Sequence, residues 1–157
     1  MLSPEEAGVI ELSLRVAAAS VAACLPAAIA TAWLLARREF AGKALLDALV
    51  HLPLVVPPVV VGYALLLAFG HNGPLGALLE PLGIVFAFRW TGAALAAAVM
   101  GFPLVVRAIR LSMEAIDPRL EAAARTLGAG PWRVFFTVTL PLAWPGLLTG
   151  ALLGFAR

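Results

Sequence analysis

Four long stretches without a charged residue most constrain what this chain can fold into. They cover residues 16–36, 48–79, 90–106 and 134–156. An α-helix needs about 17–25 apolar residues to cross the hydrocarbon of a bilayer. Lipid offers the backbone no hydrogen-bonding partner, so a crossing segment must satisfy its own amides. The stretches lack the alternation of a barrel strand, and the chain is expected to be an all-α integral membrane protein in contact with the lipid bilayer.

Composition supports this class and excludes others. Hydrophobic residues make up 62% of the 157 residues and charged residues 13%, whereas a soluble domain has about 45–50% and 25%. We treat residues 1–157 as a single domain. The net charge is only +2 and the basic residues flank the apolar stretches, so nucleic acid is not an expected partner. Cys, His, Asp and Glu do not cluster at metal-ligand spacing, and we expect no metal, cofactor or catalytic residue.

The basic residues predict the orientation. Eight of the eleven Lys and Arg residues lie in segments 37–48 and 107–133. Basic loops stay in the cytoplasm, so both segments are predicted to be cytoplasmic, with the N-terminus outside.

The second apolar stretch is too long for one straight helix. Pro53, Pro57 and Pro58 interrupt it, and each removes a backbone donor. We predict a helix over about 57–69, preceded by a broken or unwound lead-in at 49–56. Non-helical backbone at membrane depth is tolerated where it is buried in protein or lines a cavity. Pro53, Pro57, Pro58 and Gly62 are therefore candidates for lining a translocation path, and a simple kink is the alternative.

The segment from Arg107 to Gly128 carries two helical stripes. One is polar and one is apolar, and both recur at steps of three and four residues. Asp117 and Pro118 interrupt them, a pair typical of a helix start, and Gly128 is placed to end the helix in a left-handed conformation. We predict a short helix over 118–127 that either docks on a cytoplasmic protein or lies on lipid headgroups. The polar stripe is Arg107, Arg110, Glu114, Asp117, Glu121 and Arg125; the apolar stripe is Ile109, Met113, Ile116, Leu120, Ala124 and Leu127.

The sequence EAAARTLGAGPWRVFFTVTLP at 121–141 resembles the EAA loop of ABC importer permeases. When the pattern is anchored on Gly128, the family glutamate falls at Ala122, and Glu121 stands one residue earlier. A shift of one residue turns a side chain by about 100° around a helix, so replacing Glu121 is expected to have a milder effect than replacing Gly128. The other matching positions are Ala123, Ala124, Val138, Leu140 and Pro141.

Three further segments resemble the molybdate (ModB-like) permease subunits of this family. They are FAGKALLDALV at 40–50, HLPLVVPPVVVGY at 51–63 and AAAVMGFPLVVRAIRLSMEAID at 96–117. The resemblance implies a type I ABC importer transmembrane domain with at least four membrane helices here. Family members continue beyond the segment LLGFAR, so it also implies C-terminal truncation. Tungstate or sulfate permeases are the alternative.

The resemblance also implies a location and partners. It places the chain in the bacterial plasma (inner) membrane as a multi-pass subunit, paired with a second permease copy as a homodimer. ABC ATPase subunits would dock on a cytoplasmic coupling loop at about 107–137, and a periplasmic molybdate-binding protein would deliver the oxyanion. The implied ATPase-binding residues are Asp117, Leu120, Glu121, Ala122, Ala123, Ala124, Leu127 and Gly128.

Two other functional classes fit less well. The chain has no GxxxxGK[ST] loop to cradle a nucleotide, so it is expected to be a transport subunit and not an enzyme. A membrane enzyme would need a nucleophile and a base inside the stretches, and the candidate polar side chains there are few, namely Ser20, Cys24, Thr31 and Thr149. A secondary transporter, the lower-ranked alternative, usually carries ionisable groups inside the membrane, and the four stretches contain no Asp, Glu, Lys or Arg.

Overall fold

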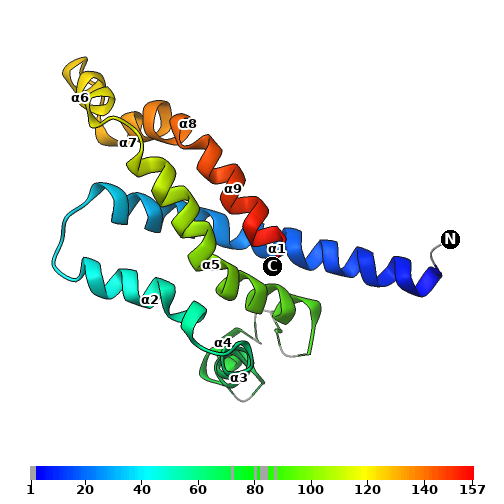
Figure 1. Cartoon of the computed structure of the whole chain (residues 1–157). Coiled ribbons are helices and arrows are strands. Elements are labelled where there is room, and N and C mark those ends of the chain that lie inside the picture. Colours follow the sequence, from blue (N-terminus) through cyan, green and yellow to red (C-terminus); the bar gives the residue numbers. More distant parts are fainter. Residues whose placement is uncertain (1–2, 72, 80, 82–84, 87) are drawn as a thin grey trace.

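The computed structural model describes residues 3–71, 73–79, 81, 85–86 and 88–157 (Figure 1). Within these residues the chain is helical and contains no strand. The elements in chain order are α1 (Pro4–Arg37), α2 (Lys43–Val55), α3 (Pro58–Phe69), α4 (Pro74–Leu79), α5 (Trp90–Glu114), α6 (Pro118–Thr126), α7 (Pro131–Val134), the π-helical turn η2 (Phe135–Thr139), α8 (Leu140–Leu142) and α9 (Trp144–Phe155).

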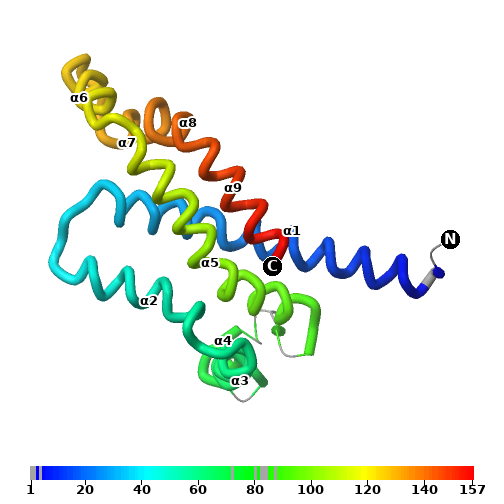
Figure 2. The backbone as a smooth tube through the Cα atoms, viewed as in Figure 1, coloured from blue at the N-terminus to red at the C-terminus, as the bar shows by residue number. Residues whose placement is uncertain are grey.

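Two straight helices form the frame of the molecule. α1 and α5 are each long and apolar enough to cross a membrane, as expected for the first and third stretches. α1 starts with a capping box, in which Ser3 and Glu6 each accept a hydrogen bond from the other's backbone amide. The backbone trace shows α1 running past the other helices toward the N-terminus (Figure 2). The fully buried core lies where α1 meets α5, and includes Ala28, Ala32, Leu35, Val105, Val106, Ile109 and Met113.

The second stretch forms a bent pair of helices, which corrects the predicted lead-in. Residues 49–55 are not unwound, because α2 is helical through Val55 with Pro53 inside it. The break falls at Val56 and Pro57, and α3 leaves α2 at 111°. Two successive prolines explain this position, since Pro58 can occupy the first turn of α3 but Pro57 cannot continue α2.

The fourth stretch is also broken, whereas a single helix was expected over 134–156. α7, η2 and α8 run on from one another, and α9 follows at an angle of 67°. The break is at Ala143, whose backbone has φ −81° and ψ 0°, outside the helical range. Counting each bent pair as one crossing gives four candidate spans among the described residues.

α9 packs closely on α5 through three glycines spaced four residues apart. A Cβ at Gly146 would overlap the Cβ of Ser112 and lie 2.9 Å from the Ala108 carbonyl oxygen. At Gly150 it would lie 3.2 Å from the Val105 carbonyl oxygen. Gly154 faces Gly101 of α5, whose Cβ position is 3.7 Å from the Gly154 Cα. Small residues at this spacing let two membrane helices approach to backbone contact.

Polar contacts between helices show which segments lie at the same end of the helix bundle. At one end, Arg37 of α1 pairs with Glu121 of α6, and Arg110 of α5 pairs with Asp47 of α2 at 2.9 Å. At the other end, the guanidinium carbon of Arg15 lies 4.3 Å from the ring centroid of Trp90. Segments 37–48 and 107–133 therefore share one end of the helix bundle, as the predicted topology requires.

Candidate functional site

α6 has the start and end that its sequence predicts. Asp117 is the N-cap, and its side chain accepts a hydrogen bond of 2.9 Å from the Arg119 amide. Gly128 has φ +82°, and the amides of Gly128 and Ala129 bond back to the carbonyls of Arg125 and Ala124. These two bonds are the Schellman pattern. The helix ends at Thr126 with Leu127 as its C-cap, one residue earlier than predicted.

The outer face of α6 is apolar. Leu120 is 48% exposed and Leu127 is 89% exposed, and Ala122 and Ala123 are exposed between them. On α5 the apolar stripe faces the core, so Ile109 and Met113 are buried. The break at Asp117–Pro118 rotates the following helix, and on α6 the apolar stripe faces outward. α6 projects with α7 at one end of the molecule (Figure 1).

Glu121, which was predicted to be among the residues that bind a partner, faces inward in this structure. Only 7% of it is exposed. The Thr139 hydroxyl donates a hydrogen bond of 2.8 Å to Oε1 of Glu121. Nε of Arg37 lies 2.9 Å from the same oxygen, and Arg125 lies 3.7 Å from Oε2. Glu121 therefore fastens α6 to the bundle, and the expectation of a mild effect on its replacement has no support from this geometry.

The Thr139 hydroxyl that bonds to Glu121 belongs to the π-helical turn η2. Neither this contact nor the π-helical turn was predicted from the sequence. The Leu140 amide bonds to the Phe135 carbonyl across η2, the wider spacing of a π-helix. Phe135 and Thr139 of this turn are both buried. A threonine in an apolar stretch carries no local signal of such a role, because its acceptor lies on another helix.

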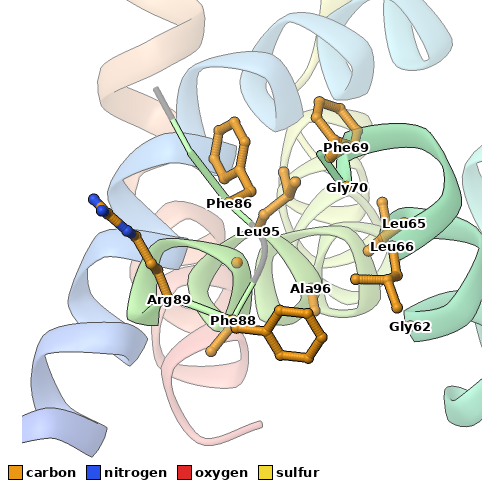
Figure 3. Close-up of a pocket in the computed structure, with 12 residues that line it drawn as sticks. Gly62, Leu65, Leu66, Phe69, Gly70, Phe86, Phe88, Arg89, Leu95 and Ala96 are labelled. Atoms are coloured by element: carbon orange, nitrogen blue, oxygen red, sulfur yellow. The ribbon is translucent and has the colours of Figure 1, made fainter. Parts of the chain in front are cut away.

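The four residues predicted to line a path do not meet in one cavity. Gly62 borders a cavity of about 200 Å³ between α3 and α5, together with Leu66 and Phe69 (Figure 3). Pro53 borders a second cavity, of about 320 Å³, beside Cys24 and Phe102. Pro57 and Pro58 are exposed at the bend and line neither of these cavities.

The cavity beside Gly62 is mainly apolar. Arg89 is the charged residue at its edge, and its guanidinium points away from Leu66 and Phe88 toward α1 (Figure 3). A Cβ at Gly62 would meet nothing within 4 Å, so this position is open. Among the described residues that line this cavity, none directs a positive charge into it, so an anion would meet only space and backbone groups there.

Three of the hydroxyl groups inside the apolar stretches are satisfied within their own helices. Ser20 donates to the Ala17 carbonyl, Thr31 to the Ala27 carbonyl and Thr149 to the Pro145 carbonyl, each at 2.8 Å. Such bonds are the usual way to accommodate a hydroxyl in a membrane helix. In the described part of the chain, no group of three or more His, Cys, Asp or Glu side chains could hold a metal ion.

Comparison with known proteins finds a family whose sequence pattern this chain matches. Residues 25–157 match the family described as "Binding-protein-dependent transport system inner membrane component". The chain is 60% identical to the molybdenum transport system permease protein ModB of Haemophilus influenzae, over 97% of the chain and 67% of that protein. It is 58% identical to ModB of Escherichia coli K12, over 100% of the chain and 69% of that protein. It is 40% identical to the sulfate transport system permease protein CysW of Synechococcus elongatus, over 94% and 52%.

Proposed function

Since the chain belongs to the family of binding-protein-dependent transport system inner membrane components, we propose that it is the permease subunit of an ATP-driven molybdate importer. The observation that carries this proposal is the likeness to molybdenum permeases along nearly the whole chain, at 58–60% identity. The sulfate permease relative is 40% identical, so sulfate is the weaker candidate cargo, with tungstate as a further alternative.

In this proposal α6 is the docking element for the ATPase subunit. A short helix that is capped at both ends and exposes Leu120 and Leu127 has the form of a helix that fits a groove. The small side chains of Ala122, Ala123 and Ala124 allow the groove walls to approach the helix backbone. The ion pair of Glu121 holds α6 against α1, so a displacement of α6 would be passed to a membrane helix.

The cargo path in this proposal is low in affinity. No stretch contains a lysine or arginine that could hold a dianion at the middle of the membrane. Backbone groups freed at the α2–α3 break are the available donors and acceptors. A separate binding protein would supply the affinity, and a second copy of the chain would complete the pathway.

A substitution at the exposed end of α6 tests the docking role. Leu127→Ser removes the most exposed apolar side chain of this surface without touching the core. The matched control is Leu111→Ser, whose side chain is 58% exposed on α5. We expect Leu127→Ser to lose co-purification with the ATPase subunit and molybdate uptake, and Leu111→Ser to retain co-purification. ATPase binding by both variants at wild-type levels would overturn the assignment of α6.

Competition tests the cargo. Uptake of labelled molybdate in cells that lack their own permease is measured with tungstate or sulfate in excess. Uptake that is restored by this chain and its partners, and that a hundredfold excess of sulfate leaves intact, is the expected result. Transport of sulfate in preference to molybdate would overturn the cargo assignment and leave the docking role standing.

A further inference from the structure

A basic cavity lies at the base of α6, apart from the outer face of that helix. It has a volume of about 290 Å³ and is bordered by α1, α6 and η2. Three arginines and one glutamate are the charged residues that line it, so its lining carries a net charge of +2. The side chains used below are Trp33, Arg37, Arg38, Glu121, Arg125 and Phe135.

Among the described residues that line this cavity, positive charges outnumber negative ones. Glu121 is the single carboxylate in the lining, and its Oε1 already faces both Arg37 and Thr139. Arg37 Nε is buried and, although 2.9 Å from that oxygen, its N–H makes no hydrogen bond. Arg38 forms no ion pair with any carboxylate in the described ranges, and its guanidinium carbon lies 5.4 Å from the Trp33 ring centroid. The three arginines outnumber the one carboxylate among the lining residues, so the cavity is suited to an anion.

Aromatic residues place the cavity at the depth of the lipid headgroups. Trp33 lies one turn before Arg37, where the first apolar stretch ends. The Trp132 ring stacks on Trp33 with 6.4 Å between centroids. Trp132 is 72% exposed and Phe136 is 59% exposed, so both offer apolar surface beside the opening. Tryptophan and arginine together are typical of the membrane–water boundary.

We propose that this cavity binds the phosphate group of an anionic phospholipid. Arg38 and Arg125 face the phosphate from α1 and from α6, and the acyl chains lie along Trp132 and Phe136. A free phosphate ion resembles the lipid phosphate in charge and oxygen geometry, but it makes no apolar contact with the exposed rings of Trp132 and Phe136. These rings therefore favour the lipid. The bound phosphate joins two helices that the Arg37–Glu121 pair already holds together. The inference depends on the chain's position in the membrane and not on its cargo, so it can fail while the transport proposal holds.

The test compares lipid retention by two variants with equal charge. The double variant Arg38→Gln/Arg125→Gln removes two arginines of the cavity and leaves Arg37, the closer of the two arginines that pair with Glu121. The control, Arg119→Gln/Arg133→Gln, removes two exposed arginines outside the cavity. Each purified protein is equilibrated in nanodiscs with phosphatidylglycerol and phosphatidylcholine, and the lipid that it retains is measured by native mass spectrometry. We expect retention of phosphatidylglycerol to fall about thirtyfold in the cavity variant, since each of the two arginines contributes about 1 kcal/mol to anionic lipid binding and about 1.4 kcal/mol is a factor of ten.

Three results would overturn the proposal. The first is equal retention of phosphatidylglycerol by the cavity variant and the control. The second is equal retention of phosphatidylglycerol and phosphatidylcholine by the wild type. The third is displacement of the lipid by millimolar inorganic phosphate, which would identify the site as one for a free anion. If the double variant unfolds in nanodiscs of phosphatidylcholine alone, the single variant Arg38→Gln is used, because Arg38 is exposed and makes no ion pair with another described residue. It should weaken retention several-fold, and an unchanged value would overturn the proposal.

Discussion

Arg37 and Glu121 form an ion pair that joins the end of α1 to the inner face of α6. The two side chains are 14% and 10% exposed, and Nε lies 2.9 Å from Oε1. Removing one member of a buried pair leaves the other charge without compensation, whereas removing both is far less harmful. The orientation of α6 therefore depends on Arg37, which lies on α1 and outside the loop that contains α6.

Glu121→Ala is expected to destabilise the protein by about 3 kcal/mol. It leaves the Arg37 charge uncompensated and the Thr139 hydroxyl without its acceptor. Thermal unfolding in detergent measures the effect, and Arg37→Gln/Glu121→Gln should recover part of it. The control is Glu39→Ala, which breaks the exposed pair of Glu39 with Lys43 and should leave the midpoint unchanged. Equal midpoints for Glu121→Ala and Glu39→Ala would contradict the anchoring role.

Gly128→Val is expected to distort the end of α6 without unfolding the membrane helices. The φ of +82° strains a β-branched residue by about 1–3 kcal/mol, although the space around the Cβ is open. Gly130→Val is a matched control, since Gly130 has open space and φ −66°. Membrane insertion should be normal for both variants, and co-purification of the ATPase should be lost only for Gly128→Val. Retained co-purification with full transport would favour a lipid-facing role for α6.

Gly146→Ala is expected to disrupt the contact of α9 with α5. The added methyl group overlaps Ser112 and approaches the Ala108 carbonyl, and overpacking of this kind destabilises by about 1–3 kcal/mol. The same substitution at Gly8 of α1 meets open space and should be neutral or stabilising, because alanine favours a helix. Thermal unfolding of the two variants side by side checks this. A loss of stability in Gly8→Ala as large as in Gly146→Ala would refute the packing explanation.

Cysteine labelling is expected to place residues 41 and 119 on the cytoplasmic side. Ala41→Cys and Arg119→Cys put thiols at exposed positions in the two basic segments, and Glu11→Cys marks the opposite end. Cys24, the single native cysteine, is replaced by alanine in each variant. An impermeant maleimide added outside should label only position 11. Labelling of 41 and 119 from outside would reverse the orientation, and labelling of these two from opposite sides would contradict the shared end of the bundle.

The sequence predicted α6 well because its start and end are encoded locally. Asp117 caps the helix through the amide two residues later, and Gly128 turns the chain whatever surrounds it. The inward direction of Glu121 could not be predicted in this way. It depends on the rotation between α5 and α6 and on two partners, Arg37 and Thr139, that are distant in the sequence.

The breaks in the second and fourth stretches also separate what the local sequence predicts from what depends on the rest of the fold. Hydropathy identifies a segment that prefers lipid, but it does not distinguish a straight helix from a bent pair. Pro57 and Pro58 made a break predictable in the second stretch, but its predicted extent was wrong, because residues 49–55 are helical. In the fourth stretch Pro145 stands in the first turn of α9, two residues after the bend at Ala143, so the sequence held a signal for this break that the expectation of a single helix did not use.

The contact of α9 with α5 also determines how force passes through the molecule. At Gly146 and Gly150 α9 contributes no side chain, and its backbone lies directly against Ser112 and Val105 of α5, so there is little compressible material to absorb a displacement. α5 and α9 are therefore expected to resist sliding and to move as one rigid unit, with the segment from Ala115 to Gly130 at its end. A force applied to this segment would therefore tilt α5 and α9 together. The bends at Ala143 and Val56 are the hinges at which neighbouring segments can move relative to this pair.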